Sequence, residues 1–400
     1  MNKGVAITGM GIISAIGNNV AENYEALLSS TSGLGRVKHL ETHHQNKILV
    51  GEASFSNAQL TATLRLPNNH NYSRTAMLGA YAAKQAVTNA GITNTSRYKT
   101  GLISATTVGG MDKTEQHFYK FLDTKESEKY IDGYHAADTT KKIAEQLNIT
   151  NAFVTTISTA CSSAANAIML GARLIKAGKL DRVIVGGTDS LSKFTINGFN
   201  SLMILSDTFC TPFDNDRNGL NLGEAAAYLV LESDTVITTE SKPVLGYVKG
   251  YGNANDAFHQ TASSEDGEGA TLAMLKALNV ASLSPEEISY INAHGTATVN
   301  NDLSESRAIT RVFKDAVPDF SSTKQFTGHT LAAAGAVEAV FSILALQHQV
   351  VFPNLNFKTQ MKDSTLTPQL NLKYKQLQTV MSNSLGFGGN CSTLIFSKDA

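Results

Sequence analysis

Three residues of reactive type, Cys161, His294 and His329, each stand at an expected junction between a strand and a helix. A cysteine at the start of a helix faces unpaired N–H groups and the positive end of the helix dipole, which favour the thiolate. Cys161 is therefore a candidate nucleophile, although a buried structural cysteine fits its surroundings equally well. A nucleophilic cysteine with a histidine acts on thioesters or amides. A second histidine, with Lys324 close by, suits a reaction that develops negative charge on a carbonyl oxygen, such as enolate formation.

These residues need strands and helices that bring them together. Residues 153–157 are apolar and β-branched, which predicts a buried strand. Small residues follow from Ser162, then an apolar face, and Gly178 marks the end of the expected helix. His294 follows a strand expected at 288–293. Because ligands gather at the carboxyl ends of strands in open α/β sheets, we expect the reactive residues to share one site.

The chain contains an internal repeat of one sequence pattern. The helix that begins at His329 repeats the pattern around Cys161: a reactive residue, a run of small residues, then an apolar face. The two stretches lie nearly half the chain apart, which indicates two similar halves. We expect the first half, with the cysteine, at residues 1–240 and the second, with the two histidines and the lysine, at 241–400.

Composition limits the class of protein. The 400 residues are 42% hydrophobic and 17% charged with a net charge of −1, which is typical of a folded α/β protein and implies no general attraction to nucleic acid or membrane. Three cysteines in so long a chain argue against a disulfide framework and for a reducing, cytoplasmic location. Glycines interrupt the N-terminal apolar run, and no apolar stretch is expected to approach about 20 residues. The sequence therefore predicts neither a signal peptide nor a membrane span.

Cofactor motifs are weak. Gly-Met-Gly at 9–11 follows an expected strand at 5–8, but Ser14 stands where the dinucleotide fingerprint requires its third glycine. The histidines of residues 35–75 lack the spacing of metal ligands. The sequence therefore predicts neither a nucleotide site nor a metal site.

Five motifs occur along the chain in a fixed order. They are Thr-Ala-Cys-Ser-Ser-Ala at 159–164, Pro-Phe-Asp-x-x-Arg-x-Gly at 212–219, Asn-Ala-His-Gly-Thr-Ala-Thr at 292–298, Lys-x-x-x-Gly-His-Thr-Leu-Ala-Ala-Ala-Gly at 324–335 and Ser-Asn-Ser-x-Gly-Phe-Gly-Gly at 382–389. With them the whole chain resembles the β-ketoacyl-acyl carrier protein synthases, condensing enzymes of the thiolase superfamily. The resemblance implies an α/β fold with five layers, α-β-α-β-α, made of two similar halves, and usually a dimer.

The resemblance also implies a role for each reactive residue. Cys161 matches the nucleophile that takes the acyl chain from its carrier as a thioester. His294 and His329 match the pair that binds the malonyl thioester carbonyl and stabilises the enolate formed by decarboxylation. The backbone N–H groups of Cys161 and Phe387 match the oxyanion hole, and the Phe387 side chain matches a gate between the acyl and malonyl pockets.

Other positions match residues that support the site. Lys324 matches a lysine that orders the site beside the second histidine. Glu305 matches the acidic residue that holds this lysine, with Asp302 nearby. Thr296 and Thr298 match positions that contact the phosphopantetheine arm.

The reaction implied by the resemblance is a decarboxylative Claisen condensation of malonyl-acyl carrier protein with an acyl group held on Cys161. Two histidines, in place of histidine and asparagine, imply an elongating enzyme for fatty acids or for a specialised polyketide or aryl polyene. No cofactor is implied beyond the phosphopantetheine of the acyl carrier protein. The expected assembly is a homodimer, or a heterodimer with a related chain-length subunit.

Several positions depart from the family pattern. Gly-Glu-Ala-Ala-Ala at 223–227 and Leu385 differ from the usual residues, and Asn390-Cys391 stands where Thr-Asn is usual. Cys391 also lies where a degradative thiolase, which acts on CoA thioesters, carries a second cysteine as its base, so this alternative stays open. Arg65 and Arg74 are the basic residues expected to contact an acidic carrier.

Overall fold

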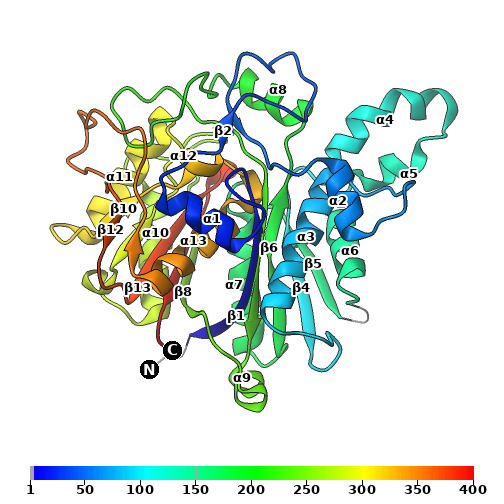
Figure 1. Ribbon diagram of the computed structural model, residues 1–400. Coiled ribbons are helices and arrows are strands. Elements are labelled where there is room, and N and C mark those ends of the chain that lie inside the picture. The colour runs from blue at the N-terminus through cyan, green and yellow to red at the C-terminus, as the bar shows by residue number, and fades with distance from the viewer. Residues whose placement is uncertain (1–3, 150–151) are drawn as a thin grey trace.

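The structure is a computed structural model that describes residues 4–149 and 152–400. These residues form one ten-stranded sheet, which runs through the molecule in Figure 1. Its strands, in spatial order, are β10 (Asp319–Ser321), β9 (Tyr290–Asn292), β13 (Thr379–Leu385), β14 (Asn390–Ser397), β8 (Gly246–Asn255), β1 (Val5–Ile13), β7 (Ala225–Glu232), β6 (Arg182–Asp189), β4 (Thr100–Ala105) and β5 (Phe153–Ile157).

The two sides of this sheet repeat one topology. The five strands before residue 240 and the five after it share one spatial order, which is third, second, fourth, fifth and first in the chain. In each half the first two pairings are parallel and the next two antiparallel. The halves meet where residues 5–7 pair with residues 246–248. The repeat confirms the expected fold of two similar halves, whereas the boundary at residue 240 stays a prediction.

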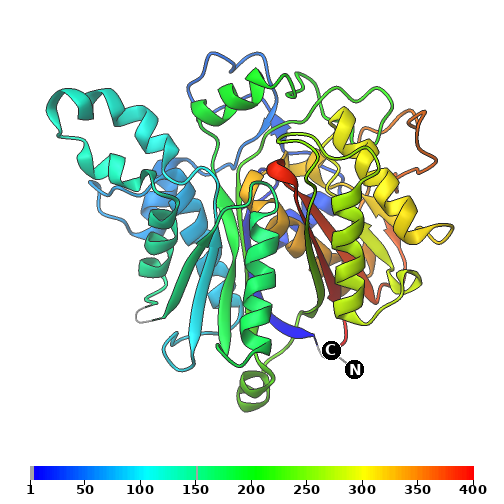
Figure 2. The same cartoon turned by 180° about the vertical axis from the view of Figure 1, so that it is seen from behind.

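Helices form three further layers. They are α3 (Arg74–Asn89) and α6 (Ala136–Gln146) on the first half, α7 (Ser163–Lys176) and α13 (Ala334–His348) in the centre, and α10 (Glu268–Ala281) and α11 (Val299–Phe313) on the second half. The two central helices share one buried apolar cluster with strands of both halves. Figure 2 brings α7 and α10 to the front. When the two five-stranded halves of the sheet are counted as separate layers, the order of layers is helix, sheet, helix, sheet, helix, as expected.

The remaining elements are short or peripheral. They are α1 (Val20–Leu28), α2 (Asn57–Leu64), α4 (Met111–Thr124), α5 (Glu128–Ile131), α8 (Lys193–Ser201), α9 (Asp234–Glu240), α12 (Lys324–Thr327), β2 (Leu34–Gly35), β3 (Val50–Gly51), β11 (Val350–Val351) and β12 (Lys373–Tyr374). Helices α4 and α5 project from the rest of the molecule at the upper right of Figure 1.

Small residues allow the central helices to pack closely. A Cβ added to Gly171 of α7 would lie 2.5 Å from Cγ1 of Val185, and one added to Gly335 of α13 would lie 2.7 Å from the backbone N of Ala165. Both separations are far below van der Waals contact, so a larger residue would force the layers apart. The small-residue runs beside the reactive residues therefore serve close packing next to the site.

One central helix has the composition of a membrane span. In the described part of the chain, Leu331–His348 has the length and mean hydropathy, 1.5, of such a span, contrary to the expectation that no stretch approaches that length. However, 89% of this window is buried inside the molecule. Its apolar character is that of a core helix, because both halves of the sheet pack around it.

Strand β5 forms where it was expected, but the prediction that it is buried is wrong. It is the last strand of the sheet and pairs with β4 alone among the described strands. The side chains of Phe153 and Val154 are 42% and 37% exposed. An apolar edge strand of this kind offers unpaired backbone groups to another chain.

Candidate active site

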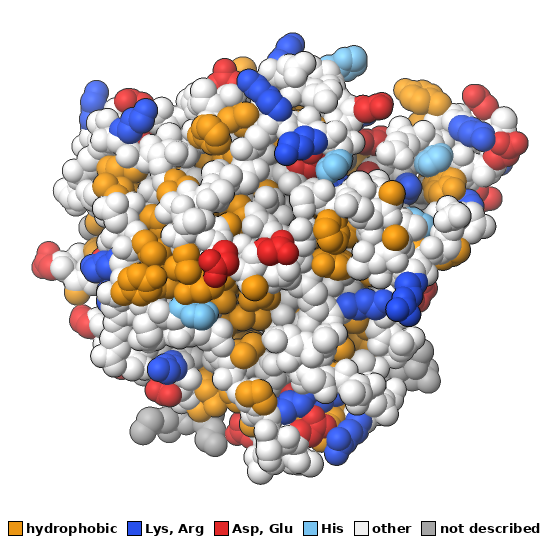
Figure 3. Space-filling view, in the orientation of Figure 1, with side chains coloured by type: hydrophobic (Ala, Val, Ile, Leu, Met, Phe, Trp, Pro, Cys, Tyr) orange, Lys and Arg blue, Asp and Glu red, His pale blue; other side chains and the backbone are white. Residues whose placement is uncertain are grey.

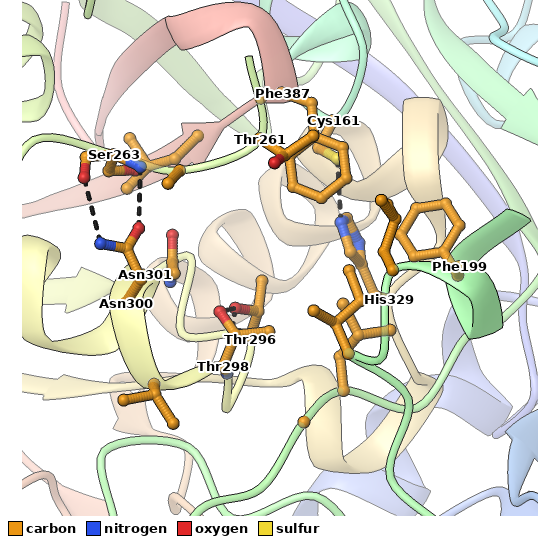
Figure 4. A pocket seen from close by; sticks show the side chains of 18 of the residues that line it. Cys161, Phe199, Thr261, Ser263, Thr296, Thr298, Asn300, Asn301, His329 and Phe387 are labelled. Atoms are coloured by element: carbon orange, nitrogen blue, oxygen red, sulfur yellow. Dashed lines mark hydrogen bonds between the residues drawn. The ribbon is translucent and has the colours of Figure 1, made fainter. Parts of the chain in front are cut away.

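Four turns at the ends of strands and helices bring the reactive residues to one cavity of about 310 Å³ (Figure 4). Cys161 lies between β5 and α7, and His294 follows β9. His329 follows α12, and Phe387 lies in the turn between β13 and β14. All four residues line the cavity. The structure therefore brings together side chains that are far apart in the sequence.

Cys161 is buried against a histidine and a backbone N–H group. Nε2 of His329 lies 3.0 Å from Sγ of Cys161, as Figure 4 shows, and the N–H of Phe387 donates to the sulfur. Burial raises the pKa of the thiol to about 11, although Lys324 and the Phe387 N–H act to lower it. Burial thus favours the neutral thiol in the resting protein, against the thiolate expected from the helix terminus. Cys161 rests as a thiol, with His329 in place to accept its proton.

The two histidines form an edge-to-face pair. Their ring centroids lie 5.3 Å apart and their planes are at 88°. Burial lowers the pKa of both rings well below the ordinary value, and the charge of Lys324 lowers it further, so both are neutral near pH 7. Nδ1 of His329 makes no hydrogen bond within the described residues, which leaves either of its nitrogens able to carry the proton.

Lys324 sets the tautomer of one histidine. Its Nζ donates to Nδ1 of His294 at 3.3 Å, which places the His294 proton on Nε2. The lysine thus hydrogen-bonds to the first histidine, and its charge also acts on the second. His294 therefore presents an N–H donor on the side of the ring away from the lysine.

The acid that holds Lys324 is Glu338, and the prediction that Glu305 holds it is wrong. Oε1 of Glu338 pairs with Nζ of Lys324, and both side chains are buried. Burial raises the pKa of Glu338 to about 7, while Lys324 acts to lower it. A sequence signal existed, because Glu338 is the one charged side chain in the apolar run 334–346 of α13. A buried carboxylate needs a partner, and the sequence analysis missed this one.

Glu305 instead holds the backbone beside His294. Its two oxygens accept the N–H groups of His294 and Gly295, each at 2.8 Å, and Oε1 also accepts Nδ2 of Asn383 at 3.2 Å. A fully buried carboxylate with three donors fixes the turn in place. Glu305 therefore positions His294 through its backbone and makes no contact with Lys324.

Asp302 links two of the motifs. Its carboxylate accepts the N–H of Phe213 at 2.7 Å and that of Ala297 at 3.1 Å, and it lies 3.9 Å from Nε of Arg217. These contacts hold the Pro-Phe-Asp turn against the segment that carries Thr296. Asp302 supports the cavity wall and does not reach the lysine.

Three non-glycine residues in the turns that carry the site residues adopt the left-handed conformation. They are Ala160, with φ 52°, Ala297, with φ 68°, and Leu331, with φ 53°. Each such residue costs about 1 kcal/mol or more, and packing must compensate for it. These turns carry Cys161, the two threonines and His329, so strain collects where side chains are aimed into the cavity.

Thr296 and Thr298 lie on the cavity wall as the resemblance implied. Their hydroxyls are 2.9 Å apart, and Figure 4 shows both in the cavity beside the start of α11. Next to them, Asn300 exchanges two hydrogen bonds with the backbone of Ser263. These polar groups can orient an amide-containing chain that enters toward Cys161.

A second, mostly apolar cavity of about 360 Å³ also reaches Cys161. Cys161 and Phe387 line both cavities. The Phe387 ring stacks on Phe199, with 5.9 Å between centroids. Phe387 thus lies where the two cavities approach each other, and the gate role that the resemblance implies for it stays a prediction. Val108 and Leu331 are among the residues of the second cavity.

The other cysteines take no part in the site. Sγ of Cys391 lies 3.5 Å from the carbonyl oxygen of Gly389 and within contact range of Gly269, and Cys391 lines neither cavity. Cys210 is buried, with Sγ 4.0 Å from the carbonyl oxygen of Lys324. A thiolase base at Cys391 therefore does not fit. Among the described residues, no group of three or more His, Cys, Asp or Glu side chains could hold a metal ion.

One basic residue expected at the carrier surface is not accessible. Arg74 is buried, and its guanidinium pairs with Glu224 at 2.5 Å. It also donates to the carbonyl oxygen of Phe55 and to Asn57. The prediction that Arg74 contacts a carrier is therefore wrong, whereas Arg65 is exposed.

Fold and site together define a condensing enzyme of the thiolase type. Residues 2–236 match the family model "Beta-ketoacyl synthase, N-terminal domain" and residues 245–358 match "Beta-ketoacyl synthase, C-terminal domain". The chain belongs to the β-ketoacyl synthase family, as the motifs indicated.

Curated relatives cover the chain from end to end. The chain is 31% identical to 3-oxoacyl-[acyl-carrier-protein] synthase 2 of Staphylococcus aureus strain N315, over 99% of each chain. It is 30% identical to the enzyme of the same name from Vibrio cholerae, over 98% of this chain and 99% of the relative. The predicted class, an acyltransferase that condenses acyl units, is confirmed at the level of the family.

Solved structures agree with this assignment. The ishigamide ketosynthase/chain length factor superposes with a TM-score of 0.93 at 28% identity, over 100% of both chains. A ketosynthase in complex with its chain length factor from Xenorhabdus doucetiae has a TM-score of 0.85 at 32% identity, over 99% of this chain and 98% of that one. Both structures contain a ketosynthase together with a chain length factor, and the matched chains have the same fold as this one.

Proposed function

We propose that the protein is an elongating β-ketoacyl-acyl carrier protein synthase in which Cys161 carries the growing chain. The observation that carries this function is that Cys161 lines two cavities. One is shared with His294 and His329, with Lys324 bound to His294, and the other is a mostly apolar pocket. The substrates arrive on the phosphopantetheine arm of an acyl carrier protein, and no further cofactor takes part. With three free cysteines, the protein acts in the cytoplasm.

The first step transfers the acyl group. His329 accepts the Cys161 proton at Nε2 as the sulfur attacks the thioester carbonyl of the acyl carrier. The N–H of Phe387, which lies against the sulfur, and that of Cys161 donate to the resulting oxyanion. The carbon–sulfur bond to phosphopantetheine then breaks, and the departing sulfur takes the proton. The acyl chain lies in the apolar cavity.

The second step forms the carbon–carbon bond. His294 donates its Nε2–H to the carbonyl of the malonyl thioester, with His329 beside it as the second donor. The bond to the carboxylate breaks, carbon dioxide leaves, and the electron pair becomes the enolate. Its carbon attacks the acyl thioester on Cys161, the cysteine leaves as thiolate, and water supplies a proton. Neutral imidazoles suit this step because each ring can donate an N–H hydrogen bond to the carbonyl without a prior change in its protonation.

Intact-mass detection of an acyl adduct tests this function. The protein is incubated with a panel of acyl-carrier thioesters, malonyl-carrier is then added, and Cys161→Ala serves as the control. An adduct that requires Cys161 and a product two carbons longer establish the synthase. Loading from acyl-CoA alone, with cleavage of acetoacetyl-CoA, contradicts it and favours the thiolase.

A heterodimer is the second candidate assembly. The two solved structures at 28% and 32% identity each contain a ketosynthase with a chain length factor. We infer that this chain pairs through the exposed edge strand β5, either with a second copy or with a related subunit. Loading that appears only after a second subunit is added supports the heterodimer, and loading by the purified chain alone supports the homodimer.

For the carrier, we propose a docking surface on residues 36–47, the basic segment. It contains Arg36, Lys38, Lys47 and three histidines against one acid, Glu41, and the three cations are exposed. Figure 3 shows Lys, Arg and His side chains gathered at the top of the molecule, where this segment lies in Figure 1. Arg36 and Lys47 line a surface hollow with Leu205, one residue from Ile204 of the active-site cavity. An acidic carrier docked here brings its arm close to the entrance.

Charge reversal tests this surface. Arg36→Glu with Lys47→Glu is expected to raise the KM for acyl carrier about tenfold and to weaken its salt dependence, because long-range attraction is lost. Activity with a small acyl thioester is expected to stay unchanged. Lys179→Glu, at the far end of α7, is the matched control. If Arg65→Glu raises the KM and the double variant does not, the surface lies at Arg65.

A further inference from the structure

A cluster of half-buried amide and buried hydroxyl groups lies beside the segment that carries Cys161, centred on Asn390 at the start of β14. Oδ1 of Asn390 lies 2.7 Å from Oγ of Ser162, 2.8 Å from Nδ2 of Asn166 and 2.9 Å from Nδ2 of Asn253. Ser392 joins the same cluster, with its hydroxyl 2.9 Å from Oδ1 of Asn166. The proposed reaction uses none of these side chains.

The side chain of Asn390 grips the segment that carries the nucleophile. Ser162 is the residue directly after Cys161 and is the N-cap of α7. Asn166 lies in the first turn of the same helix and also donates to Oγ1 of Thr159, two residues before the cysteine. The Asn390 amide oxygen thus holds Ser162 and Asn166 directly, and it reaches Thr159, on the other side of Cys161, through Asn166.

The backbone of Asn390 grips the segment that carries Phe387. Its carbonyl oxygen accepts the N–H of Gly386 at 2.9 Å and so closes the turn around Phe387. This turn runs against the cysteine segment, because a Cβ added to Gly386 would lie 3.2 Å from the backbone N of Cys161. In Figure 2 the red turn that leads into β14 lies beside the upper end of α7.

Asn390 therefore connects the two halves of the oxyanion hole, which belong to different halves of the chain. We propose that Asn390 is a positioning residue that holds the N–H of Cys161 and the N–H of Phe387 in register during acyl transfer. The family's usual threonine at this position has one hydroxyl, which cannot match the reach of an amide. This inference rests on the proposed function, because it assigns a role within the acyl-transfer step.

Loss of the Asn390 side chain is expected to affect one step of the reaction and not the other. Displacing one oxyanion donor slows steps in which the thioester carbonyl on Cys161 becomes an oxyanion. Decarboxylation of malonyl-carrier without a primer depends on His294 and His329 and on the acids that hold them, none of which contacts Asn390 through the hydrogen bonds described above. Loss of the Asn390 side chain is therefore expected to slow acyl loading and to spare decarboxylation.

The test compares Asn390→Ala with Asn253→Ala. Asn253 lies in β8 and donates to the same cluster, at 2.9 Å to Oδ1 of Asn390 and 3.1 Å to Oδ1 of Asn166. Unlike Asn390, it makes no hydrogen bond to Ser162, which directly follows Cys161, or to Gly386, which directly precedes Phe387. Three quantities are measured for each variant: the rate at which Cys161 becomes acylated by mass spectrometry, the rate of carbon dioxide release without primer, and the melting temperature.

Asn390→Ala is expected to slow acylation at least about tenfold with carbon dioxide release within about twofold of the parent. Asn253→Ala is expected to lower the melting temperature by a similar amount and to leave acylation within about twofold. Equal slowing of acylation by the two variants, or a parallel fall of both activities in Asn390→Ala, overturns the proposal. If Cys161 of the parent protein is acylated by none of the acyl-carrier thioesters, the proposed function fails instead. That result is distinct from failure of the Asn390 proposal.

Discussion

Cys161, His294 and His329 are all buried, and burial shifts the pKa of each toward its uncharged form. The resting site is thus a set of neutral groups beside one ion pair, Lys324 with Glu338. Protons can pass between neutral partners without the large desolvation cost of separated charges. At the residue scale, the reaction therefore depends on the protonation state of Cys161 and on whether the ion pair of Lys324 with Glu338 is intact.

Alkylation of Cys161 tests its protonation state. Because its pKa is raised to about 11, the thiolate fraction should increase about tenfold with each pH unit. The rate of inactivation by iodoacetamide is expected to rise steadily from pH 7 to pH 10, measured by residual activity and by mass. A plateau near pH 7 would instead show the low pKa typical of a helix N-terminus.

The ion pair predicts a pH limit for decarboxylation. Burial raises the pKa of Glu338 to about 7, so below that pH the carboxyl is protonated and no longer neutralises Lys324. We expect primer-independent carbon dioxide release to fall as the pH is lowered through about 7. Glu338→Gln mimics the protonated form. It should show low carbon dioxide release at every pH, without the fall in release (the acid limb of the pH profile) near pH 7.

Glu305→Gln is the matched comparison for Glu338→Gln. It keeps one acceptor for the turn at His294 and leaves the ion pair of Lys324 intact. We expect it to retain the pH limb near 7, with a smaller loss of activity. The assignment of Glu338 as the partner of Lys324 is contradicted if the limb disappears in Glu305→Gln and persists in Glu338→Gln.

At the scale of helices and strands, the close packing of α7 against α13 positions the reactive residues. α7 begins just after Cys161, and α13 begins five residues after His329 and carries Glu338. Gly335 stands where α13 meets α7, with the backbone N of Ala165 only 2.7 Å from an added Cβ. The spacing of these two helices therefore sets the distance between the cysteine and the lysine–glutamate pair.

Gly335→Ala tests this packing. Overpacking of a tight core costs about 1–3 kcal/mol, and we expect a loss of that size in the free energy of unfolding, measured with urea. Gly198→Ala in α8 is the control, because an added Cβ meets nothing within 4 Å and alanine favours a helix by up to about 1 kcal/mol. Equal stability of the two variants would contradict close packing as the reason for glycine at 335.

At the scale of the whole molecule, the sheet has an exposed apolar end. β5 leads directly to the turn that carries Cys161, and its outer edge is unpaired within the described residues. The projecting helix α4 adds further exposed apolar side chains, among them Phe118 and Leu122. A partner subunit that covers this end would therefore lie next to the nucleophile and its apolar pocket.

Val154→Lys tests the pairing of this edge. A charge on an edge strand opposes pairing, so we expect the mass in solution, measured by light scattering, to fall from dimer toward monomer. Leu370→Lys is the control, since Leu370 is also an exposed apolar residue but lies in the second half. A dimer that survives Val154→Lys and dissociates with Leu370→Lys would place the interface elsewhere.

Much of the site could be predicted from the sequence alone. The types of Cys161, His294 and His329, their place at the ends of expected strands, and the motifs around them identify a condensing enzyme before any contact is known. The repeated small-residue helices likewise predict two similar halves. These inferences succeed because each depends on a few neighbouring residues, whose pattern is written in the chain.

Only the tertiary structure decided the contacts between distant segments. Lys324 could pair with Glu305 or with Glu338, and the choice depends on how α13 lies against the turn after β10. The exposure of β5 depends on which strands lie beside it, and the pKa of Cys161 on how much water packing excludes. Burial and long-range pairing arise from the assembled layers. A local pattern can mark a buried charge, as the apolar run around Glu338 does, but it does not name the partner of that charge.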